Sequence, residues 1–84
     1  MYKIILSKRA VKNLDKLDQK TYLKIYKALD FIKQSPYSPK IKFLKSHFAD
    51  CRLRVGNYRV LYDIYNKDKT ILVHKIGLRK DIYR

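Results

Sequence analysis

Several residue types that build common functional sites are absent or rare in this 84-residue sequence. It contains no glutamate, no tryptophan, one cysteine, two prolines and two glycines. A single cysteine cannot form an internal disulfide, and Gly56 and Gly77 do not form the glycine-rich loops that bind nucleotide phosphates. His47, Cys51 and His74 lack the spacing of a zinc site, and no carboxylate cluster accompanies them. We therefore expect neither a metal site nor a small-molecule cofactor.

Long hydrophobic runs are also missing. No stretch reaches the roughly 18 apolar residues that suggest a membrane-spanning helix. In the opening segment MYKIILSKRA, Lys3, Lys8 and Arg9 interrupt the apolar core that a secretory signal requires. The sequence thus favours a protein that stays in the cytoplasm. Its length leaves room for one domain, residues 1–84, with a thin core.

Negative charge is scarce. Lysine and arginine number 21 against seven acidic residues, all aspartate, and the formal net charge is +14. Charge of this density attracts polyanions, so nucleic acid, an acidic protein and an anionic membrane surface are the partners to weigh. A membrane surface would call for a basic amphipathic helix with a long apolar face, and we expect no membrane partner. The hydrophobic content of 46% indicates a folded domain rather than a disordered basic tail.

What the sequence does contain is an ordered change of hydrophobic period. Residues 2–6 are rich in β-branched and aromatic side chains and predict a strand. Apolar residues at helical spacing then predict two helices, the first capped by Ser7 and the second by Asp18. Ser35-Pro36 ends the second helix. The pattern predicts a helical hairpin over residues 8–34.

After Pro39 the period becomes two, with predicted strands at 51–55, 58–65 and 70–76, the last broken by Gly77. The fold class is therefore α+β, with a small antiparallel sheet (N-terminal strand plus C-terminal meander) packed against the N-terminal helical hairpin. Cys51, Tyr58 and Tyr62 fall on apolar faces of their strands and are expected to pack in the core, and His74 is expected to be structural.

Arginines gather on the other side of the predicted meander. Arg52 and Arg54 alternate with apolar residues, and Gly56-Asn57 is a two-residue hairpin signal. Such a turn fixes the register, because a slip of one residue would move every side chain of a strand to the opposite face. A basic, open sheet face that includes Arg59 is therefore the expected working surface.

Two segments carry a resemblance to a known family. "RLRVGNYRVLY" at 52–62 and "IGLRKDIYR" at 76–84, preceded by the lead-in "KFLK", resemble the RelE/ParE toxin superfamily, and more narrowly its RelE-like messenger-RNA-cleaving branch. The resemblance spans the chain. It implies the toxin of a type II toxin–antitoxin system, which enters the ribosomal A site and cleaves messenger RNA there. It also implies contacts with ribosomal RNA and a cognate acidic antitoxin that wraps the toxin. Cleavage would need no metal, because the ribose 2′-OH attacks the adjacent phosphate.

The resemblance also implies roles for single residues. Arg59 would bind the scissile phosphate, Arg79 would stabilise charge on the phosphate and leaving oxygen, and Tyr83 would orient or activate the 2′-OH and stack on a base. The expected RNA-binding residues are Arg52, Arg54, Lys75 and Lys80. Phosphoryl displacement builds negative charge on oxygen, and a preorganised guanidinium stabilises that charge through its planar pair of donors.

One departure leaves the general base open. The best-known branch carries a lysine pair where this chain has Arg52 and Arg54, and arginine does not lose its proton at neutral pH. Tyr83, Lys75 and His74 are the candidates for this role. Two rival functions also stay open: a ParE-like inhibitor of DNA gyrase, and a catalytically weak RNA-binding relative of the toxins.

Overall fold

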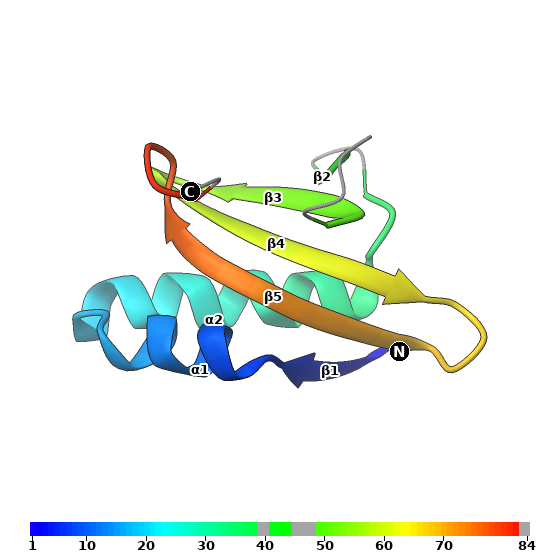
Figure 1. Ribbon diagram of the computed structural model, residues 1–84. Helices are drawn as coiled ribbons and strands as arrows, with labels where there is room; N and C mark the ends of the chain where they lie inside the picture. The colour runs from blue at the N-terminus through cyan, green and yellow to red at the C-terminus, as the bar shows by residue number, and fades with distance from the viewer. Residues whose placement is uncertain (39–40, 45–48, 83–84) are drawn as a thin grey trace.

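The computed structural model describes residues 1–38, 41–44 and 49–82 (Figure 1). These residues form two helices and five strands in one sheet. In chain order the elements are β1 (Lys3–Leu6), α1 (Lys8–Asp15), α2 (Gln19–Gln34), β2 (Ile41–Phe43), β3 (Cys51–Val55), β4 (Tyr58–Tyr65) and β5 (Thr70–Leu78). The strand order across the sheet is β1-β5-β4-β3-β2. The α+β class and the helical hairpin are confirmed.

Both helices begin at the residues that the sequence predicts. The Ser7 hydroxyl oxygen accepts a hydrogen bond from the Ala10 N–H at 3.0 Å, and Asp18 Oδ1 accepts one from the Thr21 N–H at 3.1 Å. Each cap satisfies a backbone donor that the first turn of a helix leaves without an internal partner. Hydrogen bonding from Thr21, first from its side chain and then from its backbone N–H, lowers the pKa of the Asp18 carboxyl. α2 ends at Gln34, two residues before Pro36.

The sheet is mixed rather than wholly antiparallel. β3, β4 and β5 form the predicted antiparallel meander, and β2 adds a further antiparallel strand at the edge. β1 differs from the prediction because it pairs with β5 in parallel, with Lys3 opposite Thr70 and Leu6 opposite Val73. Only strands joined by a tight turn must run antiparallel. β1 and β5 are separated by both helices and three strands, so no turn sets their relative direction.

β5 also continues past the residue where the sequence predicted its end. The strand extends to Leu78, and Gly77 lies opposite Arg59 of β4. The prediction that Gly77 breaks the strand is therefore wrong. Glycine inside a strand often marks a place where other chain segments approach closely, and the position of Ile82, given below, is such a case.

The main core lies between the helices and one face of the sheet (Figure 1). Its buried residues are Ala10, Ile25, Leu29, Ile32, Ile41, Cys51, Leu53, Val60, Tyr62, Ile71, Val73 and Ile76. Tyr58 packs against this core, so the predicted core positions of all three residues, Cys51, Tyr58 and Tyr62, are confirmed. In the described ranges no helix is long and apolar enough to cross a membrane.

Candidate functional site

The β3–β4 hairpin places three arginines on the sheet face that points away from the helices. Arg54 lies directly opposite Arg59, and Arg52 lies opposite Leu61. The turn supports this register, because Gly56 adopts a positive φ of 58°, as the first central residue of a tight hairpin turn requires. Like charges directly opposite one another destabilise a sheet. The Arg54–Arg59 pair is therefore unfavourable for folding by itself.

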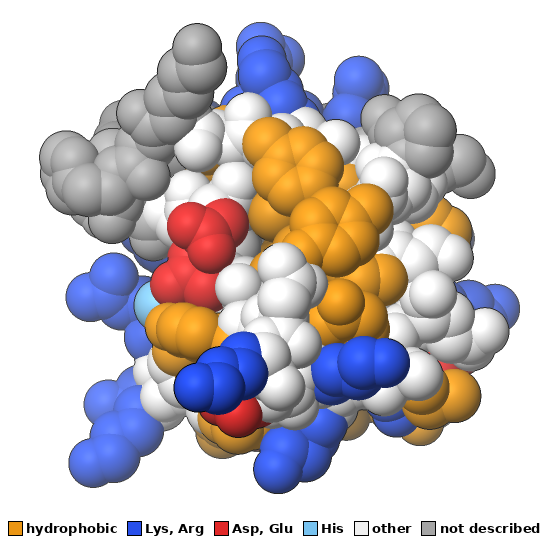
Figure 2. All heavy atoms as spheres, turned by 90° about the vertical axis from the view of Figure 1, so that its right-hand side faces the viewer, with side chains coloured by type: hydrophobic (Ala, Val, Ile, Leu, Met, Phe, Trp, Pro, Cys, Tyr) orange, Lys and Arg blue, Asp and Glu red, His pale blue; other side chains and the backbone are white. Residues whose placement is uncertain are grey.

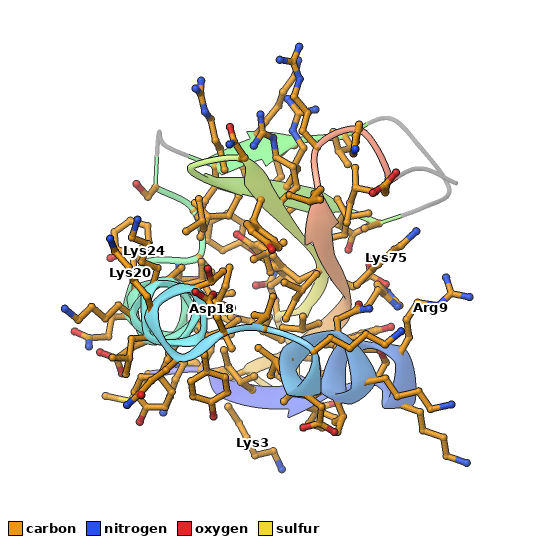
Figure 3. All side chains as sticks on the ribbon, turned by 90° about the vertical axis from the view of Figure 1, so that its left-hand side faces the viewer. Lys3, Arg9, Asp18, Lys20, Lys24 and Lys75 are labelled. Carbon is orange, nitrogen blue, oxygen red and sulfur yellow. The ribbon has the colours of Figure 1, made fainter. Side chains whose placement is uncertain are left out.

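Arg79 joins these arginines from the segment after β5. Its backbone N–H donates a hydrogen bond of 2.8 Å to the Asn57 carbonyl, which fastens it to the β3–β4 turn. Together with Ile82, the four side chains of Arg52, Arg54, Arg59 and Arg79 line a pocket of about 460 Å³, hereafter the arginine pocket. In Figure 3 the nitrogen tips of several side chains extend from the sheet on the side away from the helices.

Arg59 is the most constrained of the four. Only 8% of its surface is exposed, and Nη1 donates hydrogen bonds to the carbonyl oxygens of Gly56 at 2.9 Å and Tyr58 at 2.8 Å. These bonds hold the guanidinium against the backbone of its own turn. A guanidinium fixed in this way gives a phosphate a preorganised positive charge at little further entropic cost.

A second, smaller apolar cluster anchors the segment after β5 onto the arginine face. Ile82 is 1% exposed and packs with Leu61 and Ala49, with Leu44 against them. Two hydrogen bonds support this segment: Lys75 Nζ donates to the Asp81 carbonyl at 3.3 Å, and the Asp81 N–H donates to the Leu78 carbonyl at 2.9 Å.

Ile82 packs over the backbone of Gly77. A Cβ atom added at Gly77 would lie 3.4 Å from Ile82 Cδ1, an ordinary van der Waals distance, so the packing of Ile82 brings it close to β5 without requiring a glycine there. Sequence reasoning missed this anchor, although a signal was present. Leu61 falls on the same side of β4 as Arg59 and so interrupts the basic face with an apolar residue. This signal is weak, because single exposed apolar residues are common on protein surfaces.

Three predicted site residues remain: Lys80, Lys75 and Tyr83. Lys80 lines an adjoining pocket of about 560 Å³ with Asn57, Leu78 and Arg79, hereafter the tail pocket. Lys75 lies farther along β5, opposite Leu61, and its ammonium group contacts the tail through Asp81. Tyr83 lies outside the described residues. The structure thus brings together four of the seven predicted residues, with a fifth alongside, and their roles stay predictions.

The opposite end of the molecule has a different character. Asp63 Oδ2 lies 2.6 Å from His74 Nε2, and Asp63 Oδ1 accepts the Asp50 N–H at 2.8 Å. Asp50 in turn accepts a hydrogen bond from the Ile64 N–H at 3.3 Å. The two bonds of Asp50 tie the start of β3 to β4. The Asp63 carboxylate, which accepts the first of these bonds, is also the partner of His74 on β5. Figure 2, which views the end with the β4–β5 turn, shows acidic side chains beside an apolar patch, so the basic character is not uniform.

Burial removes two groups, the Cys51 thiol and the Tyr62 hydroxyl, from proton-transfer chemistry at neutral pH. Burial raises the pKa of the Cys51 thiol to about 11, and burial likewise raises the pKa of Tyr62. Cys51 and Tyr62 are cross-strand partners on the core face, and Tyr62 donates a hydrogen bond of 3.3 Å to the Pro36 carbonyl. Both groups therefore stay protonated. No three His, Cys or Asp side chains converge as a metal site in the described part of the chain.

Known proteins with similar sequences and folds are toxins. A family model described as the ParE toxin of the type II toxin–antitoxin system parDE matches residues 4–83. The toxin candidate RelE1 of Methanocaldococcus jannaschii is 30% identical over 87 residues, which cover 99% of this chain and 96% of that protein.

Two solved complexes contain chains with the same fold. One is the archaeal RelE–RelB complex from Pyrococcus horikoshii OT3, with a TM-score of 0.80 and 29% identity, covering 95% of this chain and 97% of that one. The other is the RelB–RelE antitoxin–toxin complex from Methanococcus jannaschii, with a TM-score of 0.72 and 26% identity, covering 94% of each chain.

Proposed function

We propose that this chain, which belongs to the RelE/ParE superfamily of type II toxin–antitoxin toxins, is a ribosome-dependent endoribonuclease that cleaves messenger RNA in the A site without a metal ion. The observation that carries the proposal is the arginine pocket, in which Arg52, Arg54, Arg59 and Arg79 converge. Repulsion between Arg54 and Arg59, which lie directly opposite one another, lowers the stability of the fold. The negative charge of a phosphate backbone would reduce this repulsion.

The proposed reaction builds negative charge on the phosphate oxygens and on the leaving oxygen. The ribose 2′-oxygen attacks the adjacent phosphorus, the bond from phosphorus to the 5′-oxygen breaks, and the products carry a 2′,3′-cyclic phosphate and a 5′-OH. A base takes the proton of the 2′-OH, and a proton is delivered to the leaving 5′-oxygen. Arg59, fixed by Gly56 and Tyr58, is suited to bind the non-bridging oxygens, and Arg79 to stabilise charge on the leaving oxygen.

Two of the three candidates for the general base have other partners in the structure. His74 Nε2 is engaged with Asp63, and the Lys75 ammonium group contacts the Asp81 carbonyl. We therefore favour Tyr83 as the residue that orients or activates the 2′-OH. Support comes from the chemistry of tyrosine: its hydroxyl can donate and accept a hydrogen bond, and its ring can stack on an unstacked base.

The second candidate is inhibition of DNA gyrase, which the description of the matching family model favours because it names the ParE branch. Gyrase poisoning would act through protein contacts and would not require the arginine pocket. A supercoiling assay run beside ribosome-programmed cleavage separates the two functions.

Cleavage tests the proposal at single residues. In single-turnover assays on programmed ribosomes, Arg59→Ala and Arg79→Ala should each slow cleavage by on the order of a hundredfold or more, as the loss of an oxyanion donor does. The matched control is Arg9→Ala, which removes the same charge from the exposed surface of α1 (Figure 3) and should leave the cleavage rate at saturation unchanged. Full activity of the Arg59→Ala, Arg79→Ala double variant would exclude the site.

Two further measurements address the chemistry. Tyr83→Phe keeps the aromatic ring and removes the hydroxyl, so full activity of this variant would assign the base elsewhere. Products should carry cyclic phosphate ends, and the chemical step should survive a reduction of free magnesium that still leaves the ribosome assembled. A chemical step that strictly requires magnesium would contradict metal-independent cleavage.

The partner that we propose is a small acidic antitoxin that covers the arginine pocket. The two archaeal complexes pair RelE with RelB, and the +14 charge of this chain favours an acidic polypeptide. Association should be fast and should slow as salt is added, whereas apolar anchors should keep dissociation slow. An association rate that does not change with ionic strength would contradict this charge-based account.

A further inference from the structure

The arginine pocket is the first of three adjoining hollows that surround the β3–β4 turn. It shares Arg79 with the tail pocket. The tail pocket shares Asn57 with a third hollow of about 210 Å³, hereafter the helix pocket, which lies between α2 and the hairpin and is lined by residues that include Thr21, Lys24 and Tyr58. Because each hollow has a wall residue in common with the next, they follow one another around the end of the molecule.

Positive charge accompanies this series of hollows. Lys80 lines the tail pocket and Lys24 lines the helix pocket. Lys20 stands one helical turn from Lys24 on α2, and Figure 3 shows the two side chains next to each other. The Asp18 carboxylate, also near the start of α2, already accepts the Thr21 N–H. A phosphate in the helix pocket would therefore meet the Lys24 ammonium group rather than an open helix end.

We propose that the RNA strand bound in the arginine pocket continues past Asn57 into the helix pocket, where Lys24 binds a phosphate outside the cleaved linkage. This proposal rests on the RNA-cleaving function proposed above. A flexible single strand can bend around a turn, and its phosphates recur at regular spacing along a basic groove. Asn57 is exposed and offers an amide donor and acceptor, which suits a base edge or a 2′-OH where the strand passes.

Binding of RNA to the protein alone tests the path. The probes are a short oligonucleotide with a 2′-O-methyl group at the cleaved nucleotide, which blocks the reaction, and the same probe lengthened at its 5′ or its 3′ end. One of the two extensions should raise the affinity about fivefold, as expected for one exposed charge pair. Lys24→Gln should abolish this gain. The slope of log affinity against log salt for the longer probe should fall by about 0.7, as expected for one lost phosphate contact on a single strand.

Matched variants separate this effect from net charge and from folding. Lys3→Gln makes the same charge change on β1, where Lys3 is exposed and points away from Lys20 and Lys24 (Figure 3), and it should keep the gain from the extension. Asn57→Asp places a negative charge where the tail and helix pockets meet and should weaken only the extended probe. Aspartate is well tolerated in turns, and Lys24 lies on the exposed surface of a helix, so both variants should unfold at the parent temperature.

Each outcome decides between the two proposals. If Lys24→Gln matches Lys3→Gln with every probe while Arg59→Ala weakens even the short one, the extended path is wrong and the cleavage site stands. If Arg59→Ala leaves the short probe unaffected, the proposed function itself fails. If Lys24→Gln leaves RNA binding intact but weakens the binding of poly-aspartate, the helix pocket serves an acidic protein and the RNA path is overturned.

Discussion

The substitution Ile82→Ala offers a sharp test of how the tail after β5 contributes to the site. Ile82 is 1% exposed and packs with Leu61 and Ala49 on the arginine face. The change removes three carbon atoms, and each buried carbon contributes about 0.8 kcal/mol. The packing of the tail should therefore weaken by about 2.4 kcal/mol, which corresponds to a roughly 60-fold shift toward the detached tail.

This loss should be local rather than global. The tail follows the last strand, and the small cluster around Ile82 is separate from the main core. Detachment can therefore occur without unfolding of the sheet, and local opening of this kind is ordinary in proteins. We expect the melting temperature to change little, the Asp81 amide that bonds to Leu78 to exchange faster, and RNA cleavage to fall steeply.

The matched control is the same substitution in the main core. Ile71 is fully buried in β5, and Ile71→Ala should lower the free energy of unfolding by about 2–5 kcal/mol while the folded fraction keeps its activity. The measurements are hydrogen exchange, thermal unfolding and single-turnover cleavage for both variants. If Ile82→Ala lowered global stability like Ile71→Ala and cleaved RNA at the parent rate, the tail would be part of the core and would position nothing.

Four further predictions concern stability, reactivity and anion binding. Ser7→Ala removes the cap on the Ala10 N–H and the 2.7 Å hydrogen bond that the Ser7 hydroxyl donates to the His74 carbonyl. Denaturant unfolding should show that the free energy of unfolding falls by about 2–3 kcal/mol. Ser7→Thr, which keeps the hydroxyl, should lower it far less. The Cys51 thiol, whose pKa burial raises to about 11, should resist alkylation in the native protein at neutral pH, and rapid stoichiometric labelling would contradict its placement. Because the folded pKa lies above the unfolded one, the stability that Cys51 contributes should be complete below about pH 9 and decline as the pH rises toward 11. Inorganic phosphate should raise the melting temperature more than chloride at equal ionic strength, since an anion that binds the arginine pocket stabilises the folded state; Arg59→Ala should remove most of that difference.

Local signals in the sequence were sufficient for the helices and for the arginine face. Ser7 and Asp18 mark helix starts because their side chains satisfy backbone donors that the helix leaves without partners. The Gly56-Asn57 turn fixes the register of β3 and β4, and that register alone places Arg54 opposite Arg59. These features depend on residues close together in the sequence, where periodicity and turn chemistry are informative.

Features that depend on contacts distant in sequence were not predictable in this way. The parallel pairing of β1 with β5 joins residues about 67 positions apart, as in Lys3 with Thr70. β2 has only three residues and too short a pattern to identify. Gly77 looked like a strand break because its context, the approach of Ile82, comes from a segment that folds back. The predicted role of Tyr83 falls on a residue outside the described part of the chain.

The central strand β4 explains how a basic pocket is held rigid in so small a protein. Hydrogen-bonded neighbours flank it on both sides, β3 and β5. Its alternate residues serve two purposes: Val60 and Tyr62 are buried in the main core, whereas Arg59 lines the arginine pocket and Leu61 anchors the tail. Because successive side chains of a strand point to opposite faces, the packing that stabilises the fold also fixes the positions of the residues on the pocket side. The repulsion between Arg54 and Arg59 therefore acts on the central strand of the sheet, whose pairing on both sides and whose core packing keep Arg59 in position.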